Sequence, residues 1–225
     1  MYIKPELFDF FRELKENNNR TWFKANKNRY ERVVKEPLYS FIEAFADRLP
    51  AISPHYQAIA RMNGGSFFRI YRDIRFSKDK TPYKTAAALH FRHESAPDVH
   101  APGLYLHLEP GEVYVGCGIW KPGSETLSRI RTRISEHPKV WLAAINDKAF
   151  ISTYTLGGDS LIRPPKGYDP DHPLIDDLKR KDYLASLELS EEVACQPDFL
   201  DRYVDLCIKS APFMEFLTES IGLPW

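Results

Sequence analysis

The chain has few cysteines, no long apolar stretch and no net charge, and each shortage excludes a class of protein. Its three cysteines, Cys117, Cys195 and Cys207, lack the close pairs that hold zinc or exchange disulfides, so they are predicted to be reduced core thiols. No run of about 18 residues is free of charge, and the mean hydropathy is −0.43, which argues against a membrane span. A cytoplasmic location and no membrane partner are therefore expected.

The balance of charge also limits the choice of partner. The chain has 31 basic and 31 acidic residues and a pI near 7.1, so it lacks the basic excess of proteins that grip long nucleic acids. It also lacks a Gly-rich phosphate loop, a dinucleotide fingerprint, a nucleophile elbow and a zinc-protease helix motif. No cofactor is expected, and the sequence leaves the reaction open.

Periodicity predicts a single α+β domain over residues 1–225, with a mainly antiparallel sheet of hairpins flanked by N-terminal, middle and C-terminal helices. The predicted parts are a helical region at 1–62, a sheet at 63–122, helices at 123–147, a strand and Pro-rich loop at 148–190, and a C-terminal helix at 191–225. Strands are predicted at 66–72, 85–93, 103–109, 112–120 and 183–189, with more strand and turn at 148–163. Thr21, Ser124 and Asp171 are predicted helix caps, Pro37 is expected to kink or start a helix, and Pro212 to disturb the last one.

Two alternating runs around Glu109-Pro110-Gly111-Glu112 predict a β-hairpin. A two-residue turn directs apolar pairs toward the core: Leu108 with Val113, Leu106 with Val115, and Leu104 with Cys117. The opposite face then carries Tyr105, His107, Glu109, Tyr114 and Trp120, together with Gly116 and Gly118. The two glycines predict a shallow strip that suits a ligand or a covering helix.

The segment from Arg69 to Lys84 carries the strongest chemical signal. It has six cations and two carboxylates, a net charge of +4, while the remaining positions of this neutral chain sum to −4. Concentrated positive charge indicates an anionic partner or a buried ion network. In the predicted strand the arginines alternate between faces, and the lysines beyond Phe76 belong to a loop that can fold over an anion.

These side chains predict an anion clamp, because arginine offers a planar fork, lysine a movable charge and tyrosine a hydroxyl donor. Its residues are Arg69, Arg72, Arg75, Lys80, Tyr83 and Lys84. Asp73 and Asp79 either orient these cations or act as a base or metal ligand. For Asp73 we favour the orienting role, because nearby arginines lower a carboxyl pKa. Asp73 and His107 are the candidates for proton transfer.

A second cluster, from Arg163 to Pro173, is rich in proline and reads as a stiff loop. It either adds Arg163 and Lys166 to the anion-binding site or serves only as a packing loop, and nothing in the local sequence distinguishes these alternatives.

Four histidines lie close together in sequence: His90, His93, His100 and His107. Their spacing does not complete a recognisable ligand set, so no metal site is predicted.

The signature of the basic segment resembles a known family. Arg69, Arg72, Asp73, Arg75, Phe76, Asp79, Lys80 and Tyr83 match the pattern Arg-x-x-Arg-Asp-x-Arg-Phe, then Asp or Asn, Lys and Tyr, of the bacterial domain-of-unknown-function family 2461. The resemblance extends over 17–30, 104–122 and 163–173, and hence over nearly the whole chain. It implies a single family domain without an assigned activity, so no catalytic roles are carried over.

Three functions remain open. The leading hypothesis is an anion-binding protein, with an enzyme acting on a phosphorylated or carboxylated small molecule as one form of it. The second is a module that binds a nucleic acid end or single strand, with Tyr71, Tyr105 and Trp120 as stacking platforms, although the neutral charge disfavours it. The third is a structural or interaction protein in which the arginines and aspartates neutralise one another.

Overall fold

A six-stranded antiparallel sheet with strand order β1-β2-β3-β4-β6-β5 forms the centre of the protein. This confirms the predicted α+β class. The computed structural model describes residues 3–61, 63–96 and 100–225, so positions 1–2, 62 and 97–99 of the predicted domain lie outside the described residues. The strands are β1 (Tyr56–Gln57), β2 (Ala87–His93), β3 (Gly103–Glu109), β4 (Glu112–Ile119), β5 (Thr155–Gly157) and β6 (Tyr183–Leu189).

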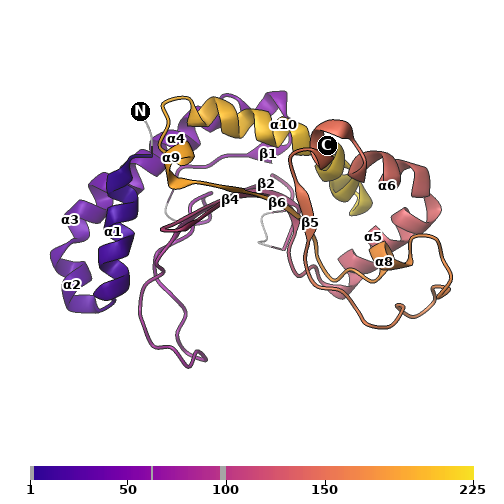
Figure 1. The fold of residues 1–225 in the computed structure, drawn as a ribbon, viewed down its shortest axis with the longest axis horizontal. Helices are drawn as coiled ribbons and strands as arrows, with labels where there is room; N and C mark the ends of the chain where they lie inside the picture. The colour runs from indigo at the N-terminus through magenta and orange to yellow at the C-terminus, as the bar shows by residue number, and fades with distance from the viewer. Residues whose placement is uncertain (1–2, 62, 97–99) are drawn as a thin grey trace.

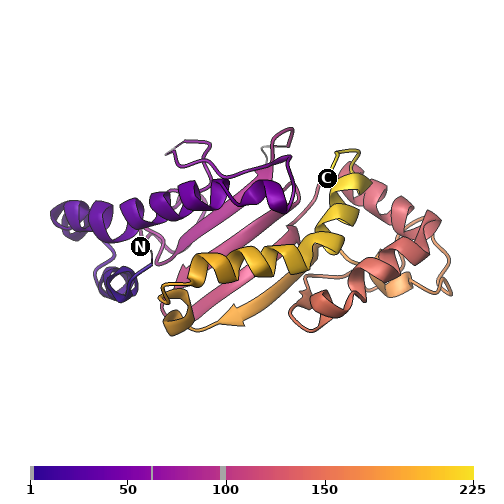
Figure 2. The same ribbon diagram turned by 90° about the horizontal axis from the view of Figure 1, so that it is seen from above.

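Helices cover one face of this sheet and leave the other face open (Figure 1). The helices of the described residues are α1 (Pro5–Glu16), α2 (Arg20–Ala25), α3 (Lys27–Tyr30), α4 (Glu36–Ala46), α5 (Ser124–Glu136), α6 (Pro138–Ile145), α7 (Lys148–Ile151), α8 (Ile175–Leu178), α9 (Glu191–Ala194) and α10 (Phe199–Ser220), with a π-helical turn at Glu31–Lys35 and a 3-10 turn at Leu49–Ala51; α1 to α3 and α5 to α8 extend to the two sides of the sheet (Figure 1). Figure 2 shows α4 and α10 lying side by side across the covered face. None of the described helices is both long and apolar enough to cross a membrane.

The β3–β4 hairpin has the predicted register. Leu108 pairs with Val113, Leu106 with Val115, and Leu104 with Cys117. Gly111 occupies the turn with a φ of +81°, a conformation that suits glycine because it has no Cβ. The apolar side chains of the hairpin therefore point together toward the helices.

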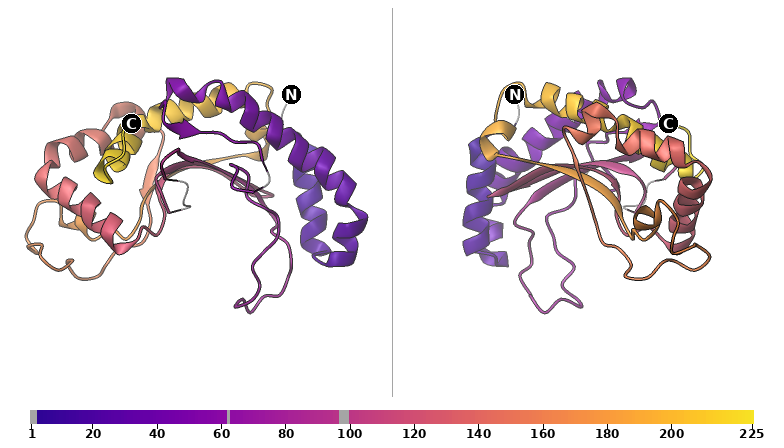
Figure 3. Two further views of the ribbon diagram at one scale, coloured as in Figure 1. Left: turned by 180° about the vertical axis from the view of Figure 1, so that it is seen from behind. Right: turned by 45° about the vertical axis from the view of Figure 1, so that its right-hand side comes forward.

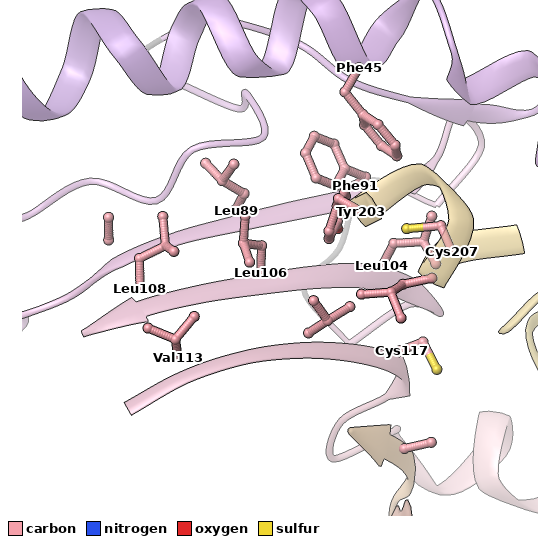
Figure 4. Close-up of a cluster of buried hydrophobic side chains, with 14 of the residues drawn as sticks. Phe45, Leu89, Phe91, Leu104, Leu106, Leu108, Val113, Cys117, Tyr203 and Cys207 are labelled. Carbon is pink, nitrogen blue, oxygen red and sulfur yellow. The ribbon is translucent and has the colours of Figure 1, made fainter. Parts of the chain in front are cut away.

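The core fills the space between the sheet and the covering helices (Figure 4). Phe45 of α4 packs against Phe91 of β2 and Tyr203 of α10, with ring centroids 4.5 and 5.0 Å away. Cys117 and Cys207 are free and buried in this core, as predicted, and burial raises the pKa of the Cys117 thiol to about 12. Burial of these apolar side chains supplies the main favourable free energy of folding.

The helix starts differ in part from the prediction. Asn19 rather than Thr21 caps α2, because its side-chain oxygen accepts a hydrogen bond from the Trp22 backbone N–H at 2.9 Å. Pro37 lies in the first turn of α4, directly after the π-helical turn, so it starts a helix as expected.

Two further predicted caps are wrong. The cap positions of α5 and α8 are held by Gly123 and Leu174, not by Ser124 and Asp171. The predicted strand and turn at 148–163 contains a helical turn, α7, before the short strand β5. Its N-cap Asp147 accepts hydrogen bonds from two backbone N–H groups, which explains why the helical turn begins there.

The predicted strand at 66–72 is also wrong. This part of the chain makes only two isolated bridges, Phe67 with Leu89 and Tyr71 with Tyr83. The first bridge lies beside β2, on the same edge that pairs with β1, and the second belongs to a fold-back in which the Lys84 N–H donates to the Ile70 carbonyl at 2.8 Å. Residues 70–84 therefore pair with each other instead of continuing the sheet.

Two long segments project on the open side of the sheet (Figures 1 and 3). One joins β1 to β2 and contains the basic residues from Arg69 to Lys84. The other joins β5 to α8 and contains residues 158–174. The two segments lie on opposite sides of the open face, and the views in Figure 3 agree on this placement.

Candidate functional site

The open face of the sheet carries a row of aromatic and histidine rings. The strand register places His90 opposite Tyr105, and His107 opposite Tyr114. Side chains at alternate positions of a strand share one face, so these four rings lie together on the face opposite the core. His107 stacks on Tyr114 with 4.8 Å between ring centroids and 13° between ring planes.

The glycines beside these rings do not leave the predicted empty strip. A Cβ at Gly118 would lie 2.0 Å from the Tyr183 carbonyl oxygen, and φ there is +119°, so glycine is required where β4 and β6 approach. A Cβ at Gly116 would make ordinary contact with Tyr105 at 3.6 Å. The strip is therefore bordered by the neighbouring strand and the Tyr105 side chain.

A chain of side-chain contacts runs along β3 from Thr85 through Glu109 and His107 to Tyr105. The Thr85 hydroxyl donates to Glu109 Oε1 at 2.7 Å. Glu109 Oε2 lies 3.4 Å from His107 Nε2, and His107 Nδ1 lies 3.2 Å from the Tyr105 hydroxyl. Both ring nitrogens of His107 thus have a partner, and only 15% of its side chain is exposed. An imidazole oriented in this way suits proton transfer or metal binding.

Burial sets the protonation states around His107. Burial is the main cause that raises the pKa of Tyr105. The charge of Tyr114 and a hydrogen bond with Tyr114 raise this pKa further. Burial also raises the pKa of Tyr114, while its hydrogen bond from Tyr105 acts in the opposite direction. Burial lowers the pKa of His90 to about 3, with a further contribution from Arg92. Both phenols and His90 are therefore neutral at physiological pH.

One of the predicted clamp cations, Lys84, borders this face, and a second, Arg69, is exposed and close enough for its charge to act on Lys84. The Lys84 ammonium lies 5.2 Å from the centroid of Phe68, and Phe68 packs against His90 and Tyr105 at 6.1 and 6.4 Å. Burial, and then the charge of Arg69, lower the pKa of Lys84. Within the described part of the chain, neither cation has a side-chain hydrogen bond or an ion pair with a carboxylate.

The other clamp cations of this segment are bonded within it. Arg72 binds the Asp79 carboxylate and the Thr81 hydroxyl, Arg75 pairs with Asp73 at 2.7 Å, and the Lys80 ammonium donates to the Ile74 carbonyl at 2.9 Å. These contacts pair Arg72 and Arg75 locally, but the pairs are largely exposed and do not form the ion-pair network inside the fold that the third hypothesis describes.

Asp73 fits the orienting role better than that of a base. Its hydrogen bonds with Arg75 lower its pKa to about 2, and Arg69 contributes more weakly. The pKa of Asp79 is likewise lowered to about 2, first by the Thr81 backbone N–H and then by Arg72. Both carboxylates are ionised partners of the segment and weak proton acceptors.

Tyr83 lies in the core and not in an anion site. Its ring stacks on Phe23 of α2 at 4.1 Å, and only 6% of the residue is exposed. Asn18 holds its backbone through two hydrogen bonds, at 2.9 and 3.1 Å. Tyr83 therefore anchors the basic segment to the N-terminal helices.

The structure does not bring Arg163 and Lys166 to the basic segment. Both are exposed in the segment between β5 and α8, across the open face (Figure 3). The proposed stacking platforms are also separate. Tyr71 packs edge-on against Phe23, and Trp120 stacks on His100 at 5.6 Å, beside the Lys121 ammonium.

Sequence reasoning missed the roles of Glu109 and Glu112. The register sets these two residues opposite each other, and together with His107 they offer three ligand atoms within 4.8 Å of one another. Within the described residues this is the one such group that could hold a metal ion. Its signal was present in the sequence as His-x-Glu on one strand face, followed by a two-residue turn and Glu. The prediction of no metal site started from the spacing of the four histidines and found no close carboxylate or cysteine pattern to complete it, so it did not consider Glu112 across the turn.

Comparison with known proteins places the chain in a family by sequence. A family model described as "Conserved hypothetical protein (DUF2461)" matches residues 6–216. No curated protein and no solved structure matches the chain.

Proposed function

The chain belongs to the conserved hypothetical protein family DUF2461, and from that premise we propose that its open sheet face binds an anionic small molecule beside Arg69 and Lys84. The family description assigns no activity, so the proposal depends on the chemistry of the site. Phosphate and carboxylate groups are the expected ligand groups, because an arginine fork and a lysine ammonium bind their oxygens well.

The observation that carries the proposal is that Lys84 and Arg69 have no hydrogen bond or ion pair with a carboxylate among the described residues, although Asp73 interacts weakly with Arg69 through its charge. Lys84 is partly buried, and burial, followed by the charge of Arg69, lowers its pKa. A desolvated cation beside a like charge costs free energy unless an anion compensates it. An anion between the two side chains would remove that cost.

His107 supplies a group for chemistry if the bound molecule is also a substrate. Glu109 orients its ring, and the ring borders the same face as Lys84 through Tyr105 and Phe68. Asp73 is the weaker candidate for proton transfer, because its hydrogen bonds with Arg75 lower its pKa to about 2.

Thermal unfolding at low salt tests the binding proposal. Sulfate, inorganic phosphate and common phosphorylated metabolites are added to the wild type and to Arg69→Ala, Lys84→Met and Arg75→Ala. A ligand at about 100 times its Kd should raise the Tm of the wild type by roughly 5–10 °C. Arg69→Ala and Lys84→Met should lose most of this shift.

Arg75→Ala is the matched control, because Arg75 is an exposed arginine of the same segment that is already paired with Asp73. It should keep the shift. If no anion stabilises the wild type, or if all three variants respond as the wild type does, the proposal is wrong.

A further inference from the structure

We propose that His107, Glu109 and Glu112 bind one divalent transition-metal ion at the turn end of the β3–β4 hairpin. Their ligand atoms lie within 4.8 Å of one another, and His107 Nε2 lies 3.4 Å from Glu109 Oε2. Metal–ligand distances of about 2.0–2.2 Å allow one ion to reach atoms spaced in this way after small side-chain adjustments. Two ligands are on β3 and the third is directly across the turn, so rigid strands position all three.

Other side chains already orient two of the ligands. Thr85 donates to Glu109 Oε1, which leaves Oε2 directed at His107. Tyr105 contacts His107 Nδ1, which leaves Nε2 directed at Glu109. Metal-binding histidines and carboxylates characteristically have their other polar atom held by such a partner.

The contacts of His107 also leave room for a positive ion between His107 and Glu109. When Nδ1 carries the imidazole proton and donates it to the Tyr105 hydroxyl, Nε2 presents a lone pair to the Glu109 carboxylate. A metal ion between these two electron-rich atoms would attract both.

The ligand set indicates the class of metal. One imidazole and two carboxylates suit Zn²⁺, Mn²⁺ or Fe²⁺, whereas Mg²⁺ and Ca²⁺ prefer oxygen ligands alone. Three protein ligands leave coordination positions open for a further molecule. A metal on Nε2 makes His107 a ligand, so in the metal-bound protein it is not the proton donor.

The metal site would share its end of the open face with the proposed anion site. Thr85, which bonds to Glu109, directly follows Lys84 in the chain. If the proposed anion binding is correct, a phosphorylated or carboxylated ligand can contact the metal and Lys84 together. This last step depends on the proposed function, whereas metal binding itself does not.

Isothermal titration calorimetry tests the metal site. The untagged full-length protein is first treated with EDTA, dialysed into buffer without phosphate or sulfate, and titrated with ZnCl₂, MnCl₂, MgCl₂ and CaCl₂. One equivalent of Zn²⁺ or Mn²⁺ should bind, with Mg²⁺ and Ca²⁺ at least 10-fold weaker. His107→Gln, Glu109→Gln and Glu112→Gln should each weaken binding at least 10-fold, and Thr85→Ala, which removes only an orienting contact, roughly 10-fold.

Glu188→Gln is the control for adventitious binding, because Glu188 is an exposed acid opposite Tyr114 on the neighbouring strand. It should bind metal as the wild type does. Glu112 is exposed at the turn, so Glu112→Gln should keep the wild-type Tm and remain informative if the more buried variants fail to fold. Equal metal affinity of the wild type and Glu112→Gln, or equal losses in Glu112→Gln and Glu188→Gln, would overturn the site.

The two proposals can fail separately. Arg69→Ala and Lys84→Met should keep the metal affinity measured without phosphate, even where they lose the thermal response to phosphate measured in EDTA. The reverse pattern, an intact phosphate response with no metal binding, would reject the metal site and leave the anion site standing.

Discussion

At the residue scale, cations of one short segment have different environments. Arg75 and Arg72 form ion pairs with carboxylates of their own segment, whereas Lys84 and Arg69 form no ion pair with a carboxylate among the described residues. The difference follows from the fold-back of residues 70–84, which brings Asp73 and Asp79 to Arg75 and Arg72 and leaves Lys84 beside Phe68. A count of charge in the sequence cannot distinguish these two situations.

Lys84→Met should raise the stability of the unliganded protein. The pKa of Lys84 is lowered below 10.5 on folding, so its charged form carries a cost at neutral pH that disappears as the pH rises through the folded pKa. Methionine retains the apolar stem without the charge, and the Tm should increase by about 1–3 °C at pH 7. Differential scanning calorimetry at pH 7 and pH 10 checks this; a lower Tm at pH 7 would indicate a structural role for Lys84.

His90 should make the protein sensitive to acid. Its pKa is lowered from 6.5 to about 3 on folding, so between these values the unfolded chain binds a proton that the folded chain does not. Stability is therefore lost as the pH falls through this window, with a slope of up to about 1.4 kcal/mol per pH unit. In urea unfolding experiments between pH 7 and pH 4, the free energy of unfolding should fall less steeply with decreasing pH for His90→Gln than for the wild type. Parallel curves would contradict the assignment.

At the scale of elements, the hairpin could be predicted in detail and the basic segment could not. Alternating apolar residues and a Pro-Gly turn fix the register of β3 and β4, because a one-residue slip would turn Leu106 and Val115 out of the core. The basic segment also alternates, but its pairing partner is its own far end, which includes Tyr83. Local periodicity does not reveal which strand a segment pairs with.

The same limit explains which parts of the candidate site were found. The face shared by His107, Tyr105 and Tyr114 follows from strand alternation alone. The burial of Tyr83 beneath Phe23 depends on contacts between distant segments, so the sequence could not indicate it. The sequence analysis did not name Glu112 as a site residue, although the predicted hairpin register already implied its position across the turn from Glu109.

Gly118→Ala should destabilise the sheet strongly. An added Cβ would meet the Tyr183 carbonyl oxygen at 2.0 Å, and φ is +119°, where residues with a Cβ are strained. We expect a loss of about 2–4 kcal/mol, measured by urea unfolding. Gly157→Ala on the edge strand β5 is the control, because nothing lies within 4 Å of its added Cβ, and it should change stability by less than about 0.5 kcal/mol. Similar losses in both variants would refute this account.

At the scale of the whole molecule, all the covering helices pack on one side of the sheet, and both long connecting segments project on the other (Figures 1 and 3). The two predicted basic clusters are therefore held apart by the width of the open face. The sequence allowed both clusters to contribute to one anion-binding site, but in the structure they lie at opposite sides of the open face.

This separation makes the double variant Arg163→Ala/Lys166→Ala a test of the arrangement. It removes two exposed cations from the far side of the face, whereas Arg69→Ala/Lys84→Ala removes one exposed and one partly buried cation from the near side. The thermal shift caused by inorganic phosphate at low salt should be unchanged in the first double variant and lost in the second. Equal losses in both would mean that general electrostatic attraction, and not a defined site, binds the anion.

The two buried thiols give the molecule an internal reporter of its own opening. Cys117 is on β4 and Cys207 is on α10, so each becomes accessible to a maleimide only when the sheet and its longest covering helix separate, whereas Cys195 is partly exposed in the native state. Labelling should proceed in one fast and two slow steps. The two slow labelling rates would then measure how often the interface between α10 and the sheet opens transiently, and the measurement needs no substitution in the chain.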